Sequence, residues 1–408
     1  MTKQERQGWA ITATLFVALF FLWGAGYNTS PVFFPALLHA FGYSKGRMAL
    51  VSSAIALSVG ITAPFAGALL DRIEARVVMP VGAVVAGIGF LTLSRASSFH
   101  GLIVGAVVLG TGLGASTFLP ASLVVANWFG ERRGTALGVT TAGMELGGMG
   151  MTILAGYVIA HAGWRAAYAV LAIPAIVLIA PLLAIVVRTR PADGRALNVA
   201  RRADSLPGLE TGEAIRTRAF WMLAVAELSW GVFVAGVFVH TVQYLIGLGY
   251  GRTMATGVLS LLLGLAAVGK PLMGALGDRI GGRTALGIGF LAMAAATAML
   301  IFAEAPWILA AFVIVQGITG AAPVALIPMI LAETLGLKRF GSLFGIMGFL
   351  MTLGLSIGAP MVGRMADLAG NYTGAFEVCV AIALVGAAAS FACSAPVYLA
   401  IPRVAEAK

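Results

Sequence analysis

Charged residues are scarce in this chain of 408 residues, where Asp, Glu, Lys and Arg make up 10% and hydrophobic residues 60%. Soluble domains carry about 25% charged residues, so the composition excludes an ordinary soluble protein. The only two cysteines, Cys379 and Cys393, lie on one apolar segment, too far apart to form a disulfide with each other. No metal-ligand spacing, nucleotide-binding loop or pair of catalytic groups is present, so we expect no metal, no cofactor and no enzyme.

Long apolar stretches recur along the whole chain and leave no room for a separate soluble domain. A bilayer core of about 30 Å is crossed by a helix of about 20 apolar residues. The sequence therefore predicts an all-α integral membrane protein with twelve transmembrane helices. The first stretch lacks a cleavage site, so we interpret it as a span rather than a signal peptide. The expected spans are 9–28, 46–70, 77–94, 100–128, 134–160, 165–187, 218–246, 253–276, 282–302, 306–331, 340–362 and 373–400.

Basic residues are distributed unequally between the two sides of these spans. Of the 26 Lys and Arg residues, 19 lie on the side of the termini and 6 on the other side, and Lys270 lies within a span. The positive-inside rule then places both termini in the cytoplasm. A net charge of +10 can indicate nucleic-acid binding, but the placement of the basic residues at span ends indicates orientation in the cell (inner) membrane instead. We expect a six-helix half over 1–187, a cytoplasmic linker over 188–217 and a second half over 218–408, functional as a monomer.

Two motifs recur at the same offset of 207 residues. The segment Gly67–Arg72 recurs as Gly274–Arg279, and the pattern Arg132, Gly134, Gly138 recurs as Arg339, Gly341, Gly345. Two independent matches at one offset predict a duplicated six-span unit. Because six is an even number, both copies have the same orientation, which is the parallel-repeat arrangement of the major facilitator superfamily.

The turn after the second span of each half resembles the Gly-x-x-x-Asp-Arg-x-Gly-x-Arg signature of that superfamily. The second half matches it in full, whereas the first half has Glu74 in place of the second glycine. In this motif the Asp can cap a neighbouring helix and pair with the Arg, which closes the cytoplasmic side. The competing interpretation is that these charges only mark a loop. The candidate gating residues are Asp71, Arg72, Asp278, Arg279 and Arg283.

Within the superfamily the chain resembles the monocarboxylate transporter family and its bacterial oxalate–formate antiporter relatives. The segments that carry the resemblance are Pro31–Leu37, Asn127–Phe129, Arg132–Gly138, Gly163–Arg165 and Gly269–Pro271. Glu333 with Lys338 and Arg339 also resembles a gating motif of the family, although a solvated loop is equally consistent. The resemblance implies a secondary transporter of small organic anions that works by alternating access in the lipid bilayer.

Three charged residues lie near the middle of the membrane, where such transporters bind substrate. Counted from the cytoplasmic helix ends, Lys270 is about 12 Å deep, Glu145 about 16 Å and Glu227 about 13 Å. A lone charge at this depth costs several kcal/mol and therefore needs a partner or a function. By family analogy spans 5 and 8 face each other, so Lys270 and Glu145 can pair.

Lys270 occupies the place of an arginine that binds the substrate carboxylate in the monocarboxylate family. A lysine keeps the charge but loses the bidentate geometry. The competing interpretation is a structural cation held by helix-end carbonyls. Glu145 is expected either to neutralise the empty Lys270 or to carry the coupling proton, and a static ion pair between the spans is the alternative. Glu227 is a second candidate proton site, or else a protonated glutamate bonded to a neighbouring helix.

Other polar residues are weaker candidates for contacts with the substrate. Thr117 and Gln316 lie near mid-depth, where helix–helix contacts are the commoner role. The remaining candidates are Tyr27, Asn28, His240 and Tyr244, near the expected outer ends of spans 1 and 7. An interfacial anchor is the favoured interpretation for Tyr244. A single histidine is also a weak signal for a proton site.

These observations favour a transporter of monocarboxylates such as lactate, pyruvate or formate/oxalate, proton-coupled or anion-exchanging. The single deep cation favours a monoanion over a dianion. The alternative is a drug or other small-metabolite efflux transporter of the same superfamily. Exporters of that kind usually carry a Gly-Pro pair in span 5, which 141–156 lacks. A cationic cavity residue also disfavours cationic drugs.

Overall fold

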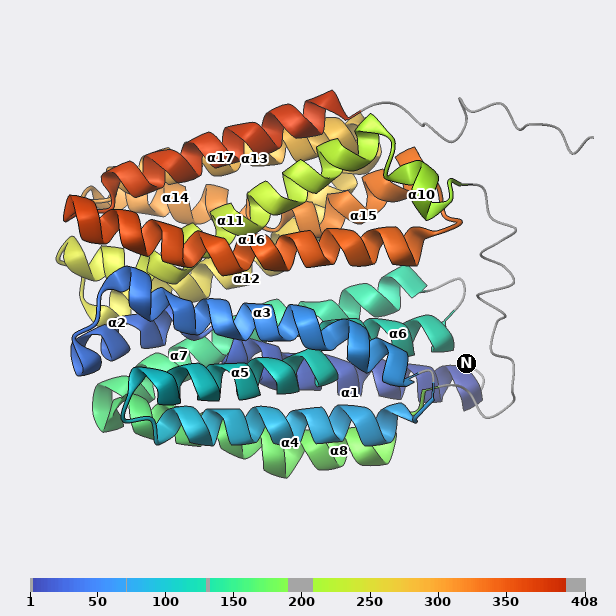
Figure 1. The fold of residues 1–408 in the computed structure, drawn as a ribbon, viewed down its shortest axis with the longest axis horizontal. Coiled ribbons are helices and arrows are strands. Elements are labelled where there is room, and N and C mark those ends of the chain that lie inside the picture. The colour runs from blue at the N-terminus through green and yellow to red at the C-terminus, as the bar shows by residue number, and fades with distance from the viewer. Residues whose placement is uncertain (1–2, 71, 130–132, 190–207, 394–408) are drawn as a thin grey trace, which may run out of the picture.

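The computed structural model describes residues 3–70, 72–129, 133–189 and 208–393. The helices lie side by side along one direction, with the first half of the chain below the second half in Figure 1. The first half contains α1 (Lys3–Gly26), α2 (Ser30–Phe41), α3 (Lys45–Leu70), α4 (Ala75–Ser94), α5 (Phe99–Ser116), α6 (Phe118–Trp128), α7 (Arg133–Ile173), the π-helix η1 (Pro174–Ile179) and α8 (Ala180–Val186). The second half contains α10 (Thr211–Ala214), α11 (Arg218–Gly247), α12 (Arg252–Ile280), α13 (Gly282–Ile301), α14 (Pro306–Thr319), α15 (Ala322–Leu335), α16 (Phe340–Ala369) and α17 (Thr373–Ala392).

Eleven helical stretches of the described residues are long and apolar enough to cross a membrane. One of them, Thr135–Val186, is 52 residues long, which is about twice what one crossing needs. It contains Gly163 with φ 82° and ψ 167°, a conformation outside the helical region. A positive φ of this kind is open to glycine at little cost. The stretch thus makes two crossings with the turn at Gly163, and the described residues form the twelve spans that the hydropathy pattern predicts.

Several span boundaries differ from those expected. The first span does not end at 28, because 30–41 continues as the buried helix α2 and the whole stretch Glu5–Phe41 is one candidate span. Both α12 and α16 extend several residues beyond the expected ends. Asp278 and Arg279 therefore lie in the last turn of α12 and Arg364 lies one turn before the last of α16, not in loops. Long polar side chains at helix ends reach the interface, and hydropathy alone does not include them.

Three spans are interrupted part-way through the membrane. The interruptions separate α1 from α2, α5 from α6 at Thr117, and α14 from α15 at Gly320 and Ala321. The last two lie in spans 4 and 10, which are equivalent in the repeat. In transporters with internal repeats, interrupted helices at corresponding positions mark the region where the substrate binds.

The helices approach one another through glycines that also follow the repeat. A Cβ on Gly147 of α7 would lie 2.1 Å from the carbonyl oxygen of Phe20 on α1. Its counterpart 207 residues later, Gly354 of α16, would bring a Cβ within 2.6 Å of the carbonyl oxygen of Leu228 on α11. Small residues allow such close backbone contact between transmembrane helices. The duplication is therefore present in the packing as well as in the motifs.

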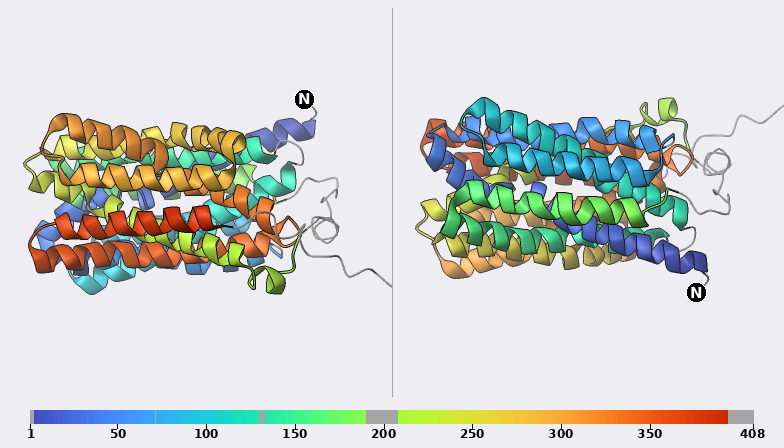
Figure 2. Two further views of the ribbon diagram at one scale, coloured as in Figure 1. Left: turned by 90° about the horizontal axis from the view of Figure 1, so that it is seen from above. Right: turned by 90° about the horizontal axis from the view of Figure 1, so that it is seen from below.

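The two ends of the bundle differ in how closely the halves approach. We call the end near Leu70, Ile280 and Thr189 the linker side and the opposite end the far side. On the far side a Cβ on Gly363 of α16 would lie 2.7 Å from the backbone nitrogen of Gly46 on α3. On the linker side Gly138, Gly274, Gly341 and Gly345 have no neighbouring heavy atom within 4 Å of such a position. The halves are thus closed on the far side and separated on the linker side, as the ribbons in Figure 1 indicate. Figure 2 shows the second half in front on the left and the first half in front on the right.

Candidate functional site

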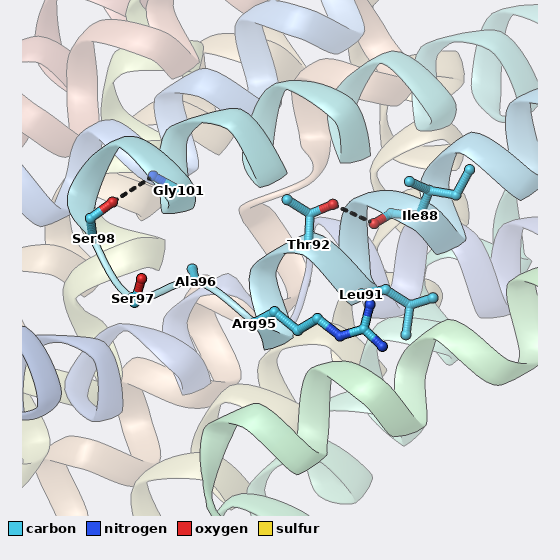
Figure 3. A pocket seen from close by; sticks show the side chains of 8 residues that line it. All are labelled: Ile88, Leu91, Thr92, Arg95, Ala96, Ser97, Ser98 and Gly101. Atoms are coloured by element: carbon cyan, nitrogen blue, oxygen red, sulfur yellow. Dashed lines mark hydrogen bonds between the residues drawn. The ribbon is translucent and has the colours of Figure 1, made fainter.

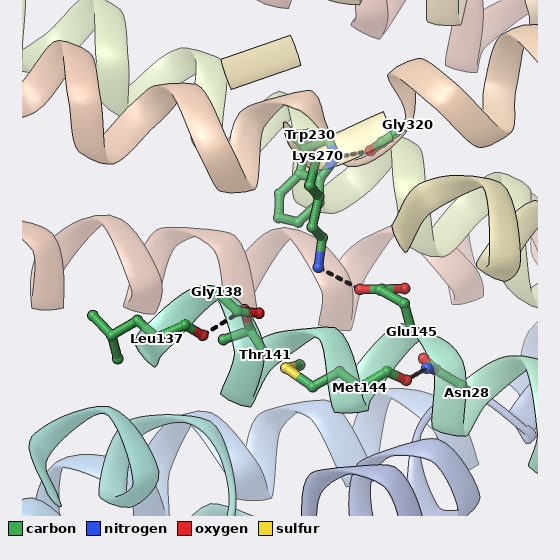
Figure 4. A network of polar contacts seen from close by, with 9 residues as sticks. All are labelled: Asn28, Leu137, Gly138, Thr141, Met144, Glu145, Trp230, Lys270 and Gly320. Atoms are coloured by element: carbon green, nitrogen blue, oxygen red, sulfur yellow. Dashed lines mark hydrogen bonds and ion pairs between the residues drawn. The ribbon is translucent and has the colours of Figure 1, made fainter. Parts of the chain in front are cut away.

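An ion pair joins the two halves near the middle of the membrane. The Lys270 ammonium on α12 donates a hydrogen bond to the Glu145 carboxylate on α7 (Figure 4). The side chain of Lys270 is 16% exposed and that of Glu145 is 13% exposed, so the pair is largely but not completely buried. The structure thus brings together the two residues that were expected at similar depth, on spans that face each other by analogy with the family.

Packing on the opposite face of α7 turns Glu145 toward α12. If Gly143 and Gly147 carried a Cβ, that atom would lie 2.3 and 2.1 Å, respectively, from carbonyl oxygens of α1, so both glycines face α1. Glu145 lies midway between them in sequence, which places it about 200° around the helix. Asn28 donates to the Met144 carbonyl at 3.0 Å and fixes this turn of α7 against the break between α1 and α2.

The orientation of Lys270 is set in the same way. A Cβ on Gly269 would lie 2.2 Å from the carbonyl oxygen of Ile318, so Gly269 faces α14. The next residue is rotated by about 100° and projects toward α7. Beside it, Trp230 of α11 donates from Nε1 to the Gly320 carbonyl at 2.9 Å, which holds the break in span 10 near the pair (Figure 4).

The pair offers one exchangeable position to an anion. The ammonium has three donors and no acceptor, and a ligand carboxylate presents the same oxygens as Glu145. Burial weakens competition from water and strengthens the attraction between the charges. A carboxylate that reaches this position would therefore present Lys270 with the same contact as Glu145.

The other candidate substrate residues lie at different distances from this pair. Asn28 and Tyr27 are not near the outer end of a span as expected, because α2 extends the span beyond them. Tyr27 stacks on Trp23, with ring centroids 5.2 Å apart. Thr117 lies in the break of span 4 and is buried, with its hydroxyl donating to the Leu113 carbonyl at 2.6 Å. Its hydroxyl is thus already used within its own span.

Two further candidates lie in the second half. Gln316 is buried just before the break in span 10, and its Oε1 has no hydrogen-bond partner among the described residues. His240 is fully buried on the far side, where Nε2 lies 2.8 Å from the Ala359 carbonyl and Nδ1 3.2 Å from the Tyr372 hydroxyl. The structure does not bring His240 to the Lys270 pair. Tyr244 donates to the Ile301 carbonyl at 3.1 Å and so anchors α11 to the end of α13.

Glu227 of α11 is a buried carboxyl group with an unpaired oxygen among the described residues. It is 6% exposed, and its Oε2 is enclosed without a hydrogen-bond partner in that part of the chain. On the helices packed against α11, the charged residues lie near the helix ends, except for Lys270, which is paired with Glu145. An ionised carboxylate without a partner is costly in such surroundings.

A hollow on the far side is separate from this site. It has a volume of about 400 Å³ and lies at the turn between α4 and α5 (Figure 3). Its lining comes from the first half alone and consists of Ile88, Leu91, Thr92, Arg95, Ala96, Ser97, Ser98 and Gly101. A site that couples the two halves needs contacts from both, so this hollow is not the transport site.

Comparison with known proteins identifies the family. The profile of the Major Facilitator Superfamily matches residues 15–269 and 258–404. The chain belongs to this superfamily. It is a multi-pass membrane transporter and not an enzyme.

Individual relatives agree with this assignment. Monocarboxylate transporter 13 of Bos taurus is 26% identical over 388 residues, which cover 93% of this chain and 87% of that protein. Monocarboxylate transporter 3 of Rattus norvegicus is 29% identical over 385 residues, covering 90% and 75%. An MFS-type transporter of Gibberella moniliformis is 26% identical over 360 residues, covering 85% and 81%. The chain thus resembles monocarboxylate transporters and a fungal transporter at similar identity.

A solved structure shows the same fold. It is a bacterial homolog of the human lysosomal transporter Spinster, in an inward-facing and unoccupied conformation. The two chains superpose with a TM-score of 0.75 at 16% identity, over 96% of this chain and 97% of that one. At this identity the likeness concerns the fold of the superfamily alone.

The superfamily signature motif makes few contacts here. Asp278 and Arg279 are exposed, and no hydrogen bond or ion pair joins them to the first half among the described residues. Arg283 donates to the Cys393 carbonyl at 2.7 Å, within its own half. Arg72 is exposed, and Asp71 lies outside the described residues. This agrees with the separation of the halves on the linker side.

The two ends of the expected linker are held by contacts of acidic residues that the sequence did not predict. Glu74, the departure from the signature, accepts from the backbone nitrogen and the hydroxyl of Thr189, both at 3.2 Å. At the other end Glu210 pairs with Lys338 at 2.9 Å and Arg339 at 2.8 Å. The hydrogen bonds from Arg339 and Lys338 lower the pKa of Glu210 below its usual range. An acidic residue in a basic linker is the sequence signal that could have indicated this contact.

Proposed function

We propose that the protein is a secondary active transporter of small organic anions, with monocarboxylates such as lactate, pyruvate and formate or the related oxalate as candidate substrates. The observation that carries the proposal is the ion pair between Lys270 and Glu145. In this pair one cation lies at the seam between the halves and keeps 16% side-chain exposure, which supports access of a solute to it. Monocarboxylate transporters among the relatives support the same substrate class.

Lys270 binds the substrate carboxylate in this account, and Glu145 occupies the same position when the site is empty. An empty site with a neutralised lysine is less costly than one with a free ammonium. The anion displaces Glu145, which breaks a contact between α7 and α12 and so links binding to movement of the halves. The two charged residues of α16, Arg364 and Asp367, both lie near its far-side end. The absence of a second deep cation there favours a monoanion.

Tyr27, Asn28, Thr117 and Gln316 are proposed as secondary substrate contacts. His240 is held on the far side, away from the Lys270 pair, and is not retained among them. Asn28 is the best supported of them, because it fixes the helical turn that carries Glu145. Thr117 and Gln316 flank the equivalent breaks in spans 4 and 10. The breaks free backbone and side-chain polar groups at the depth where a carried solute passes.

Glu227 is the proposed site of the coupling proton, with Glu145 as the second candidate. A buried carboxyl without a partner is held in its neutral form, and solvent access from alternate sides lets it load and release a proton. The linker side is proposed to be cytoplasmic, as the basic residues indicate. The protein would then lie in the cell membrane with residues 1–187 and 218–408 moving as two halves around the 188–217 linker, as a monomer. In that movement Asp71, Arg72, Asp278, Arg279 and Arg283 act as gating residues that close the linker side.

The test is uptake into proteoliposomes. Reconstituted protein should accumulate radiolabelled lactate, pyruvate, formate or oxalate, and Lys270→Ala should abolish the uptake. Lys270→Arg is the matched control, because it keeps the charge and should retain part of the activity. Uptake of lipophilic cations alone, unaffected by Lys270→Ala, would reject the proposal in favour of drug efflux. An imposed pH gradient separates proton symport from anion exchange.

A further inference from the structure

Two helix pairs form the seams between the halves, and they share a contact that follows the repeat. In the α3–α16 seam, Ser53 donates from Oγ to the Ser356 carbonyl at 2.7 Å. In the α7–α12 seam, Ser260 donates from Oγ to the Met149 carbonyl at 2.9 Å. The donor Ser260 lies 207 residues after the donor Ser53, and the acceptor Ser356 lies 207 residues after the acceptor Met149. The seams are therefore copies of one interface.

Only the α3–α16 seam carries an acidic residue at its far-side end. Asp367, in the last turn of α16, accepts from the backbone nitrogen of Lys45 at 2.9 Å through Oδ1 and from that of Gly46 at 2.8 Å through Oδ2. These nitrogens belong to the first turn of α3, where the N–H groups lack partners within the helix. The carboxylate also meets the positive end of the helix dipole. The position equivalent to Asp367 in the first half is Ala160, so the other seam has no such contact.

Neighbouring groups support this contact across the two halves. The Lys45 ammonium lies 4.7 Å from the centroid of the Tyr372 ring. The Tyr372 hydroxyl lies 3.2 Å from Nδ1 of His240, and burial raises the pKa of Tyr372, so the hydroxyl remains protonated. The His240 ring contacts Phe34 of the first half, with centroids 4.8 Å apart. The far-side closure thus rests on several connected contacts around Asp367, Lys45 and His240 and not on a single hydrogen bond.

The backbones are close enough at this point to make the closure sensitive to one methyl group. A Cβ on Gly46 would lie 2.9 Å from the backbone nitrogen of Arg364. A Cβ on Gly363 would lie 2.7 Å from the backbone nitrogen of Gly46. Neither neighbour is the end of a flexible side chain. Opening of the far side must separate these backbones and break both hydrogen bonds of Asp367.

We propose that Asp367 is the lock of the far-side gate, which keeps the empty transporter closed on that side through the first turn of α3. The seams then have different tasks although they derive from one interface. The α7–α12 seam carries the Lys270–Glu145 pair, which responds to substrate. The α3–α16 seam carries the Asp367 lock, which has no contact with the substrate position and sets the resting conformation. The assignment stands whichever solute is carried.

The lock is tested by the distance between spin labels on the far side. Cys379 and Cys393 are replaced by Ala, and labels are attached at Ser97→Cys and Glu304→Cys, which are exposed on the far side of the first and second halves. Double electron–electron resonance is then measured without substrate. Asp367→Asn removes the charge and one acceptor, and we expect about a tenfold rise in the ratio of far-side-open to far-side-closed protein, because charge-assisted hydrogen bonds are worth at least that factor. A longer distance should appear in the distribution.

Two further variants make the result decisive. Gly363→Ala keeps all charges but forces the backbones apart, and it should produce the same longer distance. Glu377→Gln, exposed on α17, removes one charge of the same half outside the lock and should leave the distribution unchanged. Should Asp367→Asn fail to fold, Gly363→Ala decides alone. A wild-type distribution in the folded Asp367→Asn protein, or in Gly363→Ala, would overturn the proposal, as would an equal shift in Glu377→Gln.

Discussion

Replacing Glu145 by Gln should make the empty site less stable and the bound anion more stable. The substitution removes the carboxylate that competes with substrate for Lys270, while the amide keeps the size and one acceptor. Breaking a buried ion pair costs about 3–5 kcal/mol and an exposed one below about 1 kcal/mol. The pair retains 16% and 13% exposure, so we assign it about 2 kcal/mol. Relief of that competition corresponds to about a 30-fold tighter anion affinity.

The affinity is measured by isothermal titration calorimetry of the purified protein with lactate, pyruvate, formate and oxalate. Glu377→Gln is the control, because it changes the net charge equally at an exposed position on α17. A Glu145→Gln protein that binds the preferred anion no more tightly than wild type would refute displacement of Glu145 by substrate. It would leave the pair as a structural contact between α7 and α12.

Three further outcomes follow from the contacts described. Gly147→Ala places a Cβ about 2 Å from a backbone carbonyl of α1 and should cost about 1–3 kcal/mol in thermal unfolding, whereas Gly138→Ala, with no neighbour within 4 Å, should cost nothing. Glu227→Gln should abolish proton-driven uptake, followed with a pH-sensitive dye inside the vesicles, but preserve anion exchange; retention of proton-driven uptake would eliminate Glu227 as the proton site. Because the pKa of Glu210 is lowered by Arg339 and Lys338, its contact should persist above the usual glutamate pKa and be lost as the pH falls through the lowered value. The Leu209 amide is bonded to the Leu335 carbonyl, and its hydrogen exchange in the wild-type protein should become faster at acidic pH. The Glu210→Gln protein should lack this acid-dependent change, and equal exchange in the two proteins at all pH values would contradict the prediction.

Hydropathy and the repeat predicted the helical fold well, because both record burial in a solvent of fixed thickness. The breaks at Asn28, Thr117 and Gly320 were not predicted, since they depend on contacts between helices and not on the apolar character of the segment. Trp230, which bonds the Gly320 carbonyl, carries no motif that indicates a partner 90 residues away. The equivalence of Ser53 and Ser260 was not predicted either, because each hydroxyl donates to a backbone carbonyl, which has no sequence signature.

The candidate site was predicted to a different extent for each residue. Charge and depth placed Lys270 and Glu145 at a similar level, since a deep cation needs a counter-charge, and the resemblance to the family supplied the expectation that their spans face each other. Asp367 was missed because it lies five residues beyond the expected end of its span, in a part assigned to a loop. Its partners are backbone nitrogens, which have no sequence signature. Glu74 was noted as a departure from the signature. Its hydrogen bond with Thr189 could not be predicted, because it depends on how the start of the linker folds against α4.

Uptake by the double variant Lys270→Gln/Glu145→Gln tests the central claim most directly. Removing both charges leaves no unpaired ion in the membrane, so the protein should fold, and loss of transport then reports loss of the anion site. We predict no saturable uptake of any of the four carboxylates into proteoliposomes that contain correctly folded double variant. Uptake at the wild-type rate by that protein would contradict the role of Lys270 as the carboxylate-binding residue.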